Sequence, residues 1–136
     1  MNIESILESS ATQSRTLIDN LLAAIDNKQP LALWVLPQTT VVWNGSPLVG
    51  GDALTQMILQ LPKTVHSLGS FDCHPLPSSN VSVMISGQVL IGETKQHGSL
   101  GFSAFLVLCP TPNATLAVQT MTYRLVHKPL DSYLDH

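Results

Sequence analysis

Charged side chains are scarce in this sequence. They make up 11% of its 136 residues, whereas a typical soluble domain carries about 25%. Only six residues are Lys or Arg, and they are spread along the chain, so the clustered basic surface that sequence-independent nucleic-acid binding requires is missing. Any role in RNA biology would therefore pass through a partner. Low charge also favours a partner that covers part of the surface over a monomer with an unusually apolar exterior.

Long apolar runs and paired cysteines are missing as well. No stretch approaches the 18 apolar residues of a membrane span, and the first residues lack the pattern of a signal peptide, so we expect no membrane association. Cys73 and Cys109 form no C-x-x-C pair, which favours reduced, partly buried thiols. A metal site needs three or four ligands, and His66, Cys73 and His74 are too few. We expect neither a metal nor another cofactor.

The first 28 residues are predicted to form a helix. Ser5 and Glu8 have the spacing of a capping box, with Ser5 as the N-cap, and Asn27 and Pro30 end the segment. Apolar residues recur at helical spacing at Leu17, Leu21, Leu22 and Ile25.

A short helix follows a predicted hairpin. Residues 31–36 are either a helical turn or an extended link, and residues 39–43 read as a strand that ends at the tight-turn pair Asn44-Gly45. Asp52 is expected to cap the second helix, and Pro62 to stop it. One face of this helix is apolar at Leu54, Met57, Ile58 and Leu61.

Everything after Lys63 has the pattern of β structure. The strand candidates are residues 65–76, 80–92, 100–109 and 116–126. Helices followed by a meander of long strands predict an α+β fold with a curved antiparallel sheet. We treat residues 1–136 as one domain, with residues 1–4 and 129–136 as flexible tails.

The predicted strand over residues 100–109 is apolar on both faces. One face carries Phe102, Ala104, Leu106 and Leu108, and the other carries Phe105 and Val107. Two short helical segments can cover one face of such a sheet, so the second face is expected to meet another chain. The alternative is a strand that curls until both of its faces are internal.

Five motifs, taken in order, resemble a known family. Residues 41–45, Val-Val-Trp-Asn-Gly, resemble the nuclear transport factor 2 superfamily. Residues 61–66, followed by Phe-Asp-Cys-His-Pro at 71–75, are similar to its export branch, the small partner of the TAP-type mRNA export receptor, which typically has Asp-Cys-Gln-Pro. Tyr-Arg-Leu at 123–125 resembles the aromatic-Arg-aromatic end of that branch. The segment 126–132 is similar to the fungal mRNA transport regulator.

This resemblance spans roughly residues 15–132 and implies a cone-shaped fold without catalytic activity. The implied role is the small subunit of a nuclear mRNA export receptor, in a heterodimer with the large subunit. It implies a location in the nucleus and at the nuclear pore with shuttling to the cytoplasm, contact with Phe-Gly nucleoporins through the complex, and only indirect contact with RNA. Residues 92–98 of this chain differ from other members of the family in two ways. Residues 92–98 form a short loop where some fungal subunits carry a long, cargo-associated insertion, and they lack the aspartates of the Ran-binding import branch.

Arg124 is the strongest candidate for partner binding. It shares a predicted strand face with Val118, Thr120, Thr122 and Val126, a face too polar for a core and too uncharged for ordinary exposure. The resemblance implies that this Arg pairs with an acidic group of the large subunit. At a two-fold contact it would face its own copy, so the charge disfavours a homodimer. We assign Met84, Ser86 and Gln88 to the same surface.

An enzyme of the same fold, an isomerase or dehydratase, is the main alternative, followed by a Ran-binding import factor. An enzyme would place a base and a donor inside the cone. The candidates are Asp52, His66, Asp72, His74 and Tyr123. His66, Asp72 and His74 have the same parity and could share a strand face, although polar strand residues at a rim or an interface explain them better. Trp34 and Trp43 are expected in the core.

Overall fold

The computed structural model describes residues 3–92 and 99–126. The predicted tail 129–136 and most of the loop 92–98 lie outside the described residues, as do residues 1–2. The elements are α1 (Ile3–Asp26), β1 (Val35–Trp43), β2 (Ser46–Val49), α2 (Gly51–Gln60), β3 (Thr64–Pro75), a single 3-10 turn (Pro77–Ser79), β4 (Val81–Ile91), β5 (Ser99–Pro110) and β6 (Leu116–Val126).

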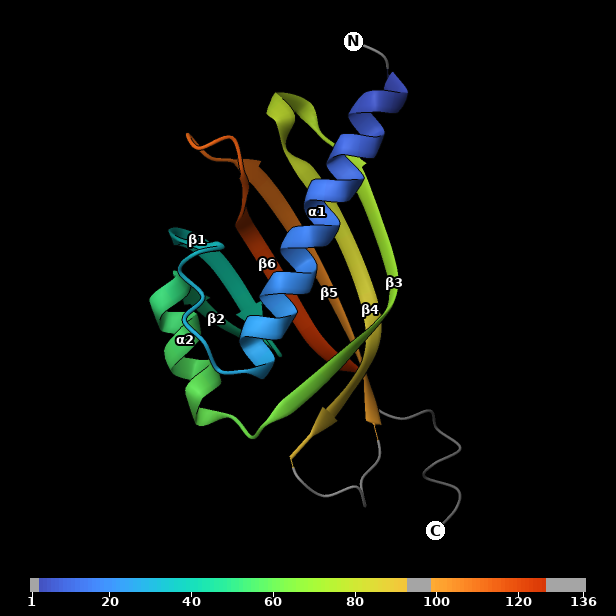
Figure 1. Cartoon of the computed structure of the whole chain (residues 1–136). Coiled ribbons are helices and arrows are strands. Elements are labelled where there is room, and N and C mark those ends of the chain that lie inside the picture. The colour runs from blue at the N-terminus through green and yellow to red at the C-terminus, as the bar shows by residue number, and fades with distance from the viewer. Residues whose placement is uncertain (1–2, 93–98, 127–136) are drawn as a thin grey trace.

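The strands form one sheet in the order β2-β1-β6-β5-β4-β3 (Figure 1). β6 pairs antiparallel with β5 and parallel with β1. The α+β prediction is confirmed, but the sheet is mixed rather than wholly antiparallel. The reason is that β1 and β6 lie far apart in the sequence, and the intervening chain allows them to run in the same direction.

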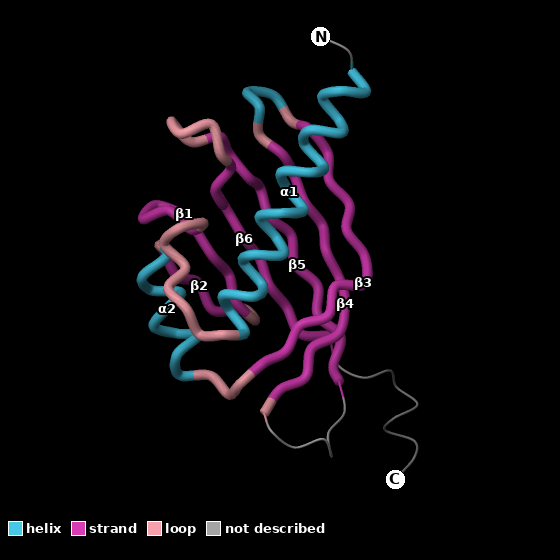
Figure 2. The backbone as a smooth tube through the Cα atoms, viewed as in Figure 1, coloured by secondary structure: helices cyan, strands magenta, loops and turns pink. Residues whose placement is uncertain are grey.

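The inner face of the sheet is covered by α1, which crosses it diagonally (Figure 2). The helical stripe that includes Ile18, Leu21 and Ile25 is buried in the same hydrophobic core as Phe102 and Leu106 of β5. The predicted apolar periodicity of α1 and its end near Asn27 are confirmed. However, α1 begins at Ile3, so Ser5 lies inside the helix and is not its N-cap.

Backbone and lysine contacts, rather than Asp52, hold the ends of α2. Gly50 is its N-cap with φ of 95°, and Asp52 sits in the first turn without a capping hydrogen bond, so the predicted Asp52 cap is wrong. At the other end, Lys28 Nζ donates to the carbonyl oxygens of Ile58 at 2.6 Å and Leu61 at 2.7 Å. An ammonium group at this end satisfies carbonyls that the helix leaves without partners.

The segment before β1 resolves the two readings that residues 31–36 allowed. A turn closes with hydrogen bonds from the amides of Trp34 and Val35 to Leu31 O, and β1 then begins at Val35. The strand starts earlier than residue 39. The turn at Asn44-Gly45 has positive φ at both residues, 49° and 88°, as a tight hairpin requires.

Irregularities in two strands decide which side chains face the core. The register of β3 shifts between Leu68 and Ser70, with Gly69 as the extra residue. Across from it, a Cβ on Gly87 would lie 2.1 Å from Ser67 O, so only glycine fits there. The register between β5 and β6 shifts in the same way, with Gln119 as the extra residue of β6. Each bulge moves later side chains to the opposite face.

Candidate partner interface

The outer face of the sheet, opposite α1, is not covered by any described helix (Figure 1). Two large apolar side chains stand on it near the middle: Met84 is 60% exposed and Phe105 is 44% exposed. They are direct neighbours across β4 and β5. The prediction that β5 would be apolar on both faces is confirmed, and its outer face is open rather than curled inward.

Cross-strand pairing arranges this surface in rows. The central row runs Thr122, Phe105, Met84, Asp72 from β6 to β3. The next row runs Arg124, Ser103, Ser86, Ser70 across the same four strands. An apolar centre is thus bordered by hydroxyl groups, with Arg124 at the β6 end and Asp72 at the β3 end of these rows.

These two rows enclose a shallow hollow of about 310 Å³. Its lining includes Arg124 from β6, Asp72 from β3, and Met84 and Phe105 between them. Within residues 3–92 and 99–126, neither Arg124 nor Asp72 takes part in an ion pair or a side-chain hydrogen bond. Both side chains are exposed to solvent.

Six of the seven residues assigned to the partner surface lie on the outer face. Arg124, Thr122, Met84, Ser86 and Gln88 are exposed, and Thr120 is half-buried. The placement of Val118 is corrected, because it is completely buried in the core. The bulge at Gln119 breaks the alternation that placed Val118 beside Arg124. Sequence reasoning did not include Ser103 and Ser70 in this surface, and it favoured a rim or interface position for Asp72 without assigning Asp72 to the partner surface.

The inner side of the sheet brings together a different set of polar residues. Asp26, the last residue of α1, accepts hydrogen bonds from His66 Nδ1 at 2.6 Å and from the His66 amide at 2.8 Å. His66 Nε2 lies 2.7 Å from the Tyr123 hydroxyl, and Thr64 Oγ1 donates to Asp26 at 2.7 Å. Because an ionised carboxylate only accepts, Nδ1 carries the proton and Nε2 accepts from Tyr123 in the neutral ring.

Burial and hydrogen bonding set the ionisation of this cluster. Burial raises the pKa of Asp26, but the hydrogen bonds from His66 and Thr64 outweigh burial, and the net pKa lies below its ordinary value. Burial, followed by the nearby charge of Asp26, raises the pKa of Tyr123 far above its ordinary range. Both residues therefore hold fixed charge states at neutral pH, with Asp26 ionised and Tyr123 neutral.

This cluster differs from the catalytic arrangement considered from the sequence. The His66 side chain is 0% exposed and Tyr123 is 2% exposed, and Phe102 packs edge-on against the His66 ring at 4.8 Å. Asp72 and His74 lie on the outer face instead, because the Gly69 bulge separates them from His66. A His66–Asp72–His74 cluster is therefore wrong. Asp26 was missed because α1 and β3 are far apart in the sequence.

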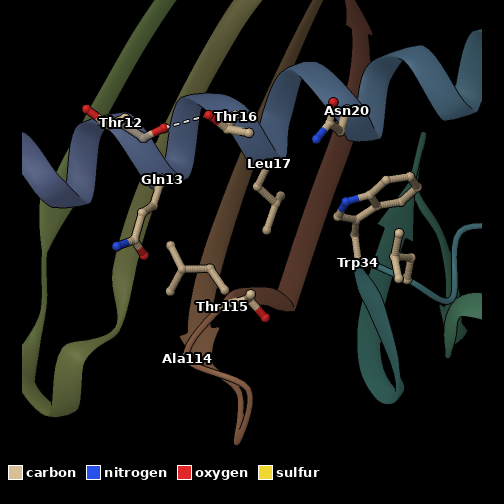
Figure 3. Close-up of a pocket in the computed structure, with 10 residues that line it drawn as sticks. Thr12, Gln13, Thr16, Leu17, Asn20, Trp34, Ala114 and Thr115 are labelled. Carbon is tan, nitrogen blue, oxygen red and sulfur yellow. Dashed lines mark hydrogen bonds between the residues drawn. The ribbon is translucent and has the colours of Figure 1, made fainter.

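A groove of about 590 Å³ opens beside α1, between the helix, the turn before β1 and the β5–β6 turn (Figure 3). In Figure 3, Leu17 and Trp34 lie along it together with Asn20 and Thr16. All ten lining residues are uncharged. Trp34 is only half-buried here, whereas Trp43 is in the core as predicted and stacks on Tyr123 at 3.8 Å.

Within the described part of the chain, no group of three His, Cys, Asp or Glu residues is placed to hold a metal ion. Cys73 and Cys109 are free and half-buried, as the sequence indicated. Burial, followed by the charge of the adjacent Asp72, raises the pKa of the Cys73 thiol and makes it less reactive. Neither described helix combines the length and the apolar character needed to cross a membrane.

Comparison with known sequences gives a consistent group. A family model described as nuclear pore RNA shuttling protein Mtr2 matches residues 8–115. NTF2-related export protein 2 of Mus musculus is 24% identical over 123 residues, which cover 85% of this chain and 86% of the mouse protein. The Homo sapiens protein of the same name is 30% identical over 95 residues, covering 65% and 66%. The match to NTF2-related export protein of Caenorhabditis elegans, 29% identical over 84 residues, covers 61% of each chain.

Solved structures show the same fold at low sequence identity. A chain of the C. albicans Mtr2-Mex67 M domain complex matches with a TM-score of 0.70 at 18% identity, covering 89% of this chain and 98% of that one. A putative scytalone dehydratase from Novosphingobium aromaticivorans matches with a TM-score of 0.77 at 13% identity, covering 91% and 89%. These likenesses establish the cone-shaped fold, which a transport protein and a putative enzyme share.

Proposed function

Since the chain belongs to the Mtr2 family of nuclear pore RNA shuttling proteins, we propose that it is the non-catalytic small subunit of a heterodimeric nuclear mRNA export receptor. The large export subunit docks on the outer face of the sheet. The observation that carries this proposal is the uncovered apolar centre of that face. Met84 and Phe105 are exposed cross-strand neighbours there, and Arg124 lies at the border.

The composition of the outer face suits a protein partner. Interfaces typically have an apolar centre and a polar, solvent-accessible rim. Here the centre is the Met84–Phe105 pair, and the hydroxyl groups of Ser86, Ser103 and Thr122 lie around it. Hydroxyl groups can bond to a partner without the cost of desolvating a full charge. The same face is too apolar to be an ordinary solvent-exposed sheet surface.

Arg124 gives the proposed interface its selectivity. Its guanidinium group is exposed and has no ion-pair partner in the described residues. A partner that covers it must supply a carboxylate, since an unpaired buried charge costs several kcal/mol. An acidic group of the large subunit fits this requirement, as the family resemblance implies.

The inner side supports a role without catalysis. The titratable cluster of Asp26, His66 and Tyr123 packs against Phe102, and its residues line neither the hollow on the outer face nor the groove beside α1. The uncharged groove beside α1 provides no group that could act as a general acid or base. The cluster instead joins the end of α1 to β3 and β6 and acts as a structural element.

The proposed complex acts between nucleus and cytoplasm and works at the nuclear pore. Contact with Phe-Gly nucleoporins and with RNA is made through the complex rather than by this chain alone. The low basic content supports indirect RNA contact, because six Lys and Arg residues in 136 cannot form an extended phosphate-binding surface.

Arg124→Asp tests the proposal directly. We expect the wild-type chain to co-purify with the large export subunit as a one-to-one complex, and Arg124→Asp to weaken that complex by more than about 100-fold. Arg15→Asp is the matched control, because Arg15 is exposed on α1, where it pairs with Asp19 of its own helix and lies over the Phe71 ring. Measurements would be light scattering after size exclusion, and titration of the purified subunits.

Two results would contradict the proposal. One is that the isolated chain forms a stable homodimer and that no larger protein co-purifies with it from cells. The other is an Arg124→Asp variant that binds the large subunit as tightly as the Arg15→Asp control does.

A further inference from the structure

We infer that Asp72 is a second specificity determinant of the outer face, and that the partner must present a basic group over Asp72 and an acidic group over Arg124. This inference rests on the proposed function, because it describes how the large subunit is recognised. Asp72 carries a charge opposite to that of Arg124, at the other side of the same hollow.

The two charges are fixed in place by the sheet. Arg124 lies on β6 and Asp72 on β3, with β5 and β4 between them, and their rows are adjacent. Three strand spacings and one row step separate the two positions by about 15 Å. They are therefore too far apart to neutralise each other, and each must find its counter-charge elsewhere.

Nothing in the described chain neutralises Asp72. Apart from Arg124, the Lys and Arg side chains of the described residues lie elsewhere: Arg15 pairs with Asp19 on α1, Lys28 caps α2, and Lys63 precedes β3. His74, exposed two residues along β3, is the only nearby titratable group on the same strand face. No ion pair or side-chain hydrogen bond to the Asp72 carboxylate occurs within residues 3–92 and 99–126.

A docked partner necessarily covers Asp72. It lies directly beside Met84, one of the two apolar residues at the centre of the face, and it lines the hollow that Arg124 also lines. A side chain that fills this hollow removes water from both charges. A carboxylate desolvated without a counter-charge opposes binding by several kcal/mol, so a tight complex requires a cation there.

The pair of charges also fixes the orientation of the partner. An apolar patch ringed by hydroxyl groups could accept a similar surface in either of two end-for-end orientations. Only one orientation places an acidic group of the partner over Arg124 and a basic group over Asp72. The reversed orientation brings like charges together at both sites. The bipolar pattern therefore selects orientation as well as partner.

Substitution of Asp72 in the intact complex tests this inference. We expect Asp72→Asn to weaken binding of the large subunit about tenfold, and Asp72→Arg by more than about 100-fold. Asp19→Asn is the matched control, as an exposed aspartate of α1 away from the sheet. Thermal unfolding of each free variant should match the wild type, because the Asp72 side chain makes no hydrogen bond or ion pair within the described residues.

A selection for suppressors identifies the partner group. Variants of the large subunit that restore binding to Asp72→Arg should replace a Lys or Arg with a neutral or acidic residue. Suppressors of Arg124→Asp should instead replace an acidic residue, at a different position about 15 Å away.

The outcomes separate this inference from the proposed function. If Asp72→Arg binds like the Asp19→Asn control while Arg124→Asp does not bind, the inference is wrong and the proposed function stands. If the wild-type chain itself fails to bind the large subunit, the proposed function fails. If the isolated chain forms a homodimer that Asp72→Arg disrupts, the two charges recognise each other between copies, and the inference is overturned.

Discussion

The two faces of one sheet differ in what covers them, and β5 shows the difference most clearly. Phe102 and Phe105 are three residues apart on this strand, yet Phe102 is 1% exposed and Phe105 is 44% exposed. The inner face is packed against α1 and is apolar apart from the hydrogen-bonded cluster of Asp26, His66 and Tyr123. The outer face has an apolar centre bordered by hydroxyl groups and two opposite charges. An apolar residue on the inner face thus stabilises the fold, and one on the outer face is available for assembly.

The largest expected effect separates these two roles. Phe102→Ala should lower the free energy of unfolding by about 3–5 kcal/mol, because it leaves a cavity under α1. Phe105→Ala should lower it by about 1 kcal/mol or less in the isolated chain, and should weaken the complex more than about tenfold. Urea unfolding and binding titration measure the two quantities. Equal losses of stability would show that the outer face is part of the core.

The next effect concerns the buried polar cluster on the inner side. Tyr123→Phe removes the hydroxyl that bonds to His66 Nε2 and leaves a buried acceptor unpaired, so we expect a loss of about 1–3 kcal/mol. The outer face offers a control at Thr122→Val, where the exposed hydroxyl has no side-chain partner among described residues. Urea unfolding of both variants at neutral pH would decide whether a polar contact matters only on the inner side.

The same cluster predicts a pH dependence. The folded-state pKa of Asp26 lies below the ordinary value of 3.8. Its contribution to stability is therefore complete above that value and is lost as pH falls through the lower, folded-state pKa. Asp26→Asn should be less stable than the wild type at pH 7, and the difference should shrink below about pH 4. Unfolding curves between pH 7 and pH 2.5 measure it, and a constant difference would contradict the assignment.

A smaller loss of stability is expected from removing the Lys28 contacts at the end of α2. Lys28→Met removes the ammonium group from the carbonyls at the end of α2, at a cost of about 1–2 kcal/mol. Lys63→Met is the control, since its side chain is exposed and makes no hydrogen bond in the described chain. Thermal unfolding should distinguish them, and equal melting temperatures would argue against the lysine cap.

The smallest effect is a gain. Ser14 is completely buried on α1, and its hydroxyl has no partner within the described residues. Ser14→Ala removes an unsatisfied polar group and should raise stability by up to about 1 kcal/mol. Ser9→Ala, at an exposed position of the same helix, should change little. A clear loss at Ser14 would mean that its hydroxyl is satisfied after all.

The sequence predicted element types better than side-chain directions. The strand over residues 116–126 matches β6, and the end of α1 and the Asn44-Gly45 turn were predicted. Val118 was placed on the wrong face, and His66 was wrongly grouped with Asp72 and His74, because the bulges at Gln119 and Gly69 each add one residue. Alternation of apolar and polar residues does not encode such an insertion. The parallel contact of β1 and β6 and the Asp26–His66 pair also depend on long-range packing.

The central position of β6 has a consequence for the order in which the chain can fold. β1 and β2 lie on one side of β6, and β5, β4 and β3 lie on the other. During synthesis, both groups of strands leave the ribosome before β6 does, and neither has its central neighbour until then. Until β6 is available, the edges of β1 and β5 that pair with it stay unpaired, so we expect this topology, dominated by non-local contacts, to fold slowly. Loss of β6 would divide the sheet in two rather than shorten it by one strand, and early nascent chains would depend on chaperones.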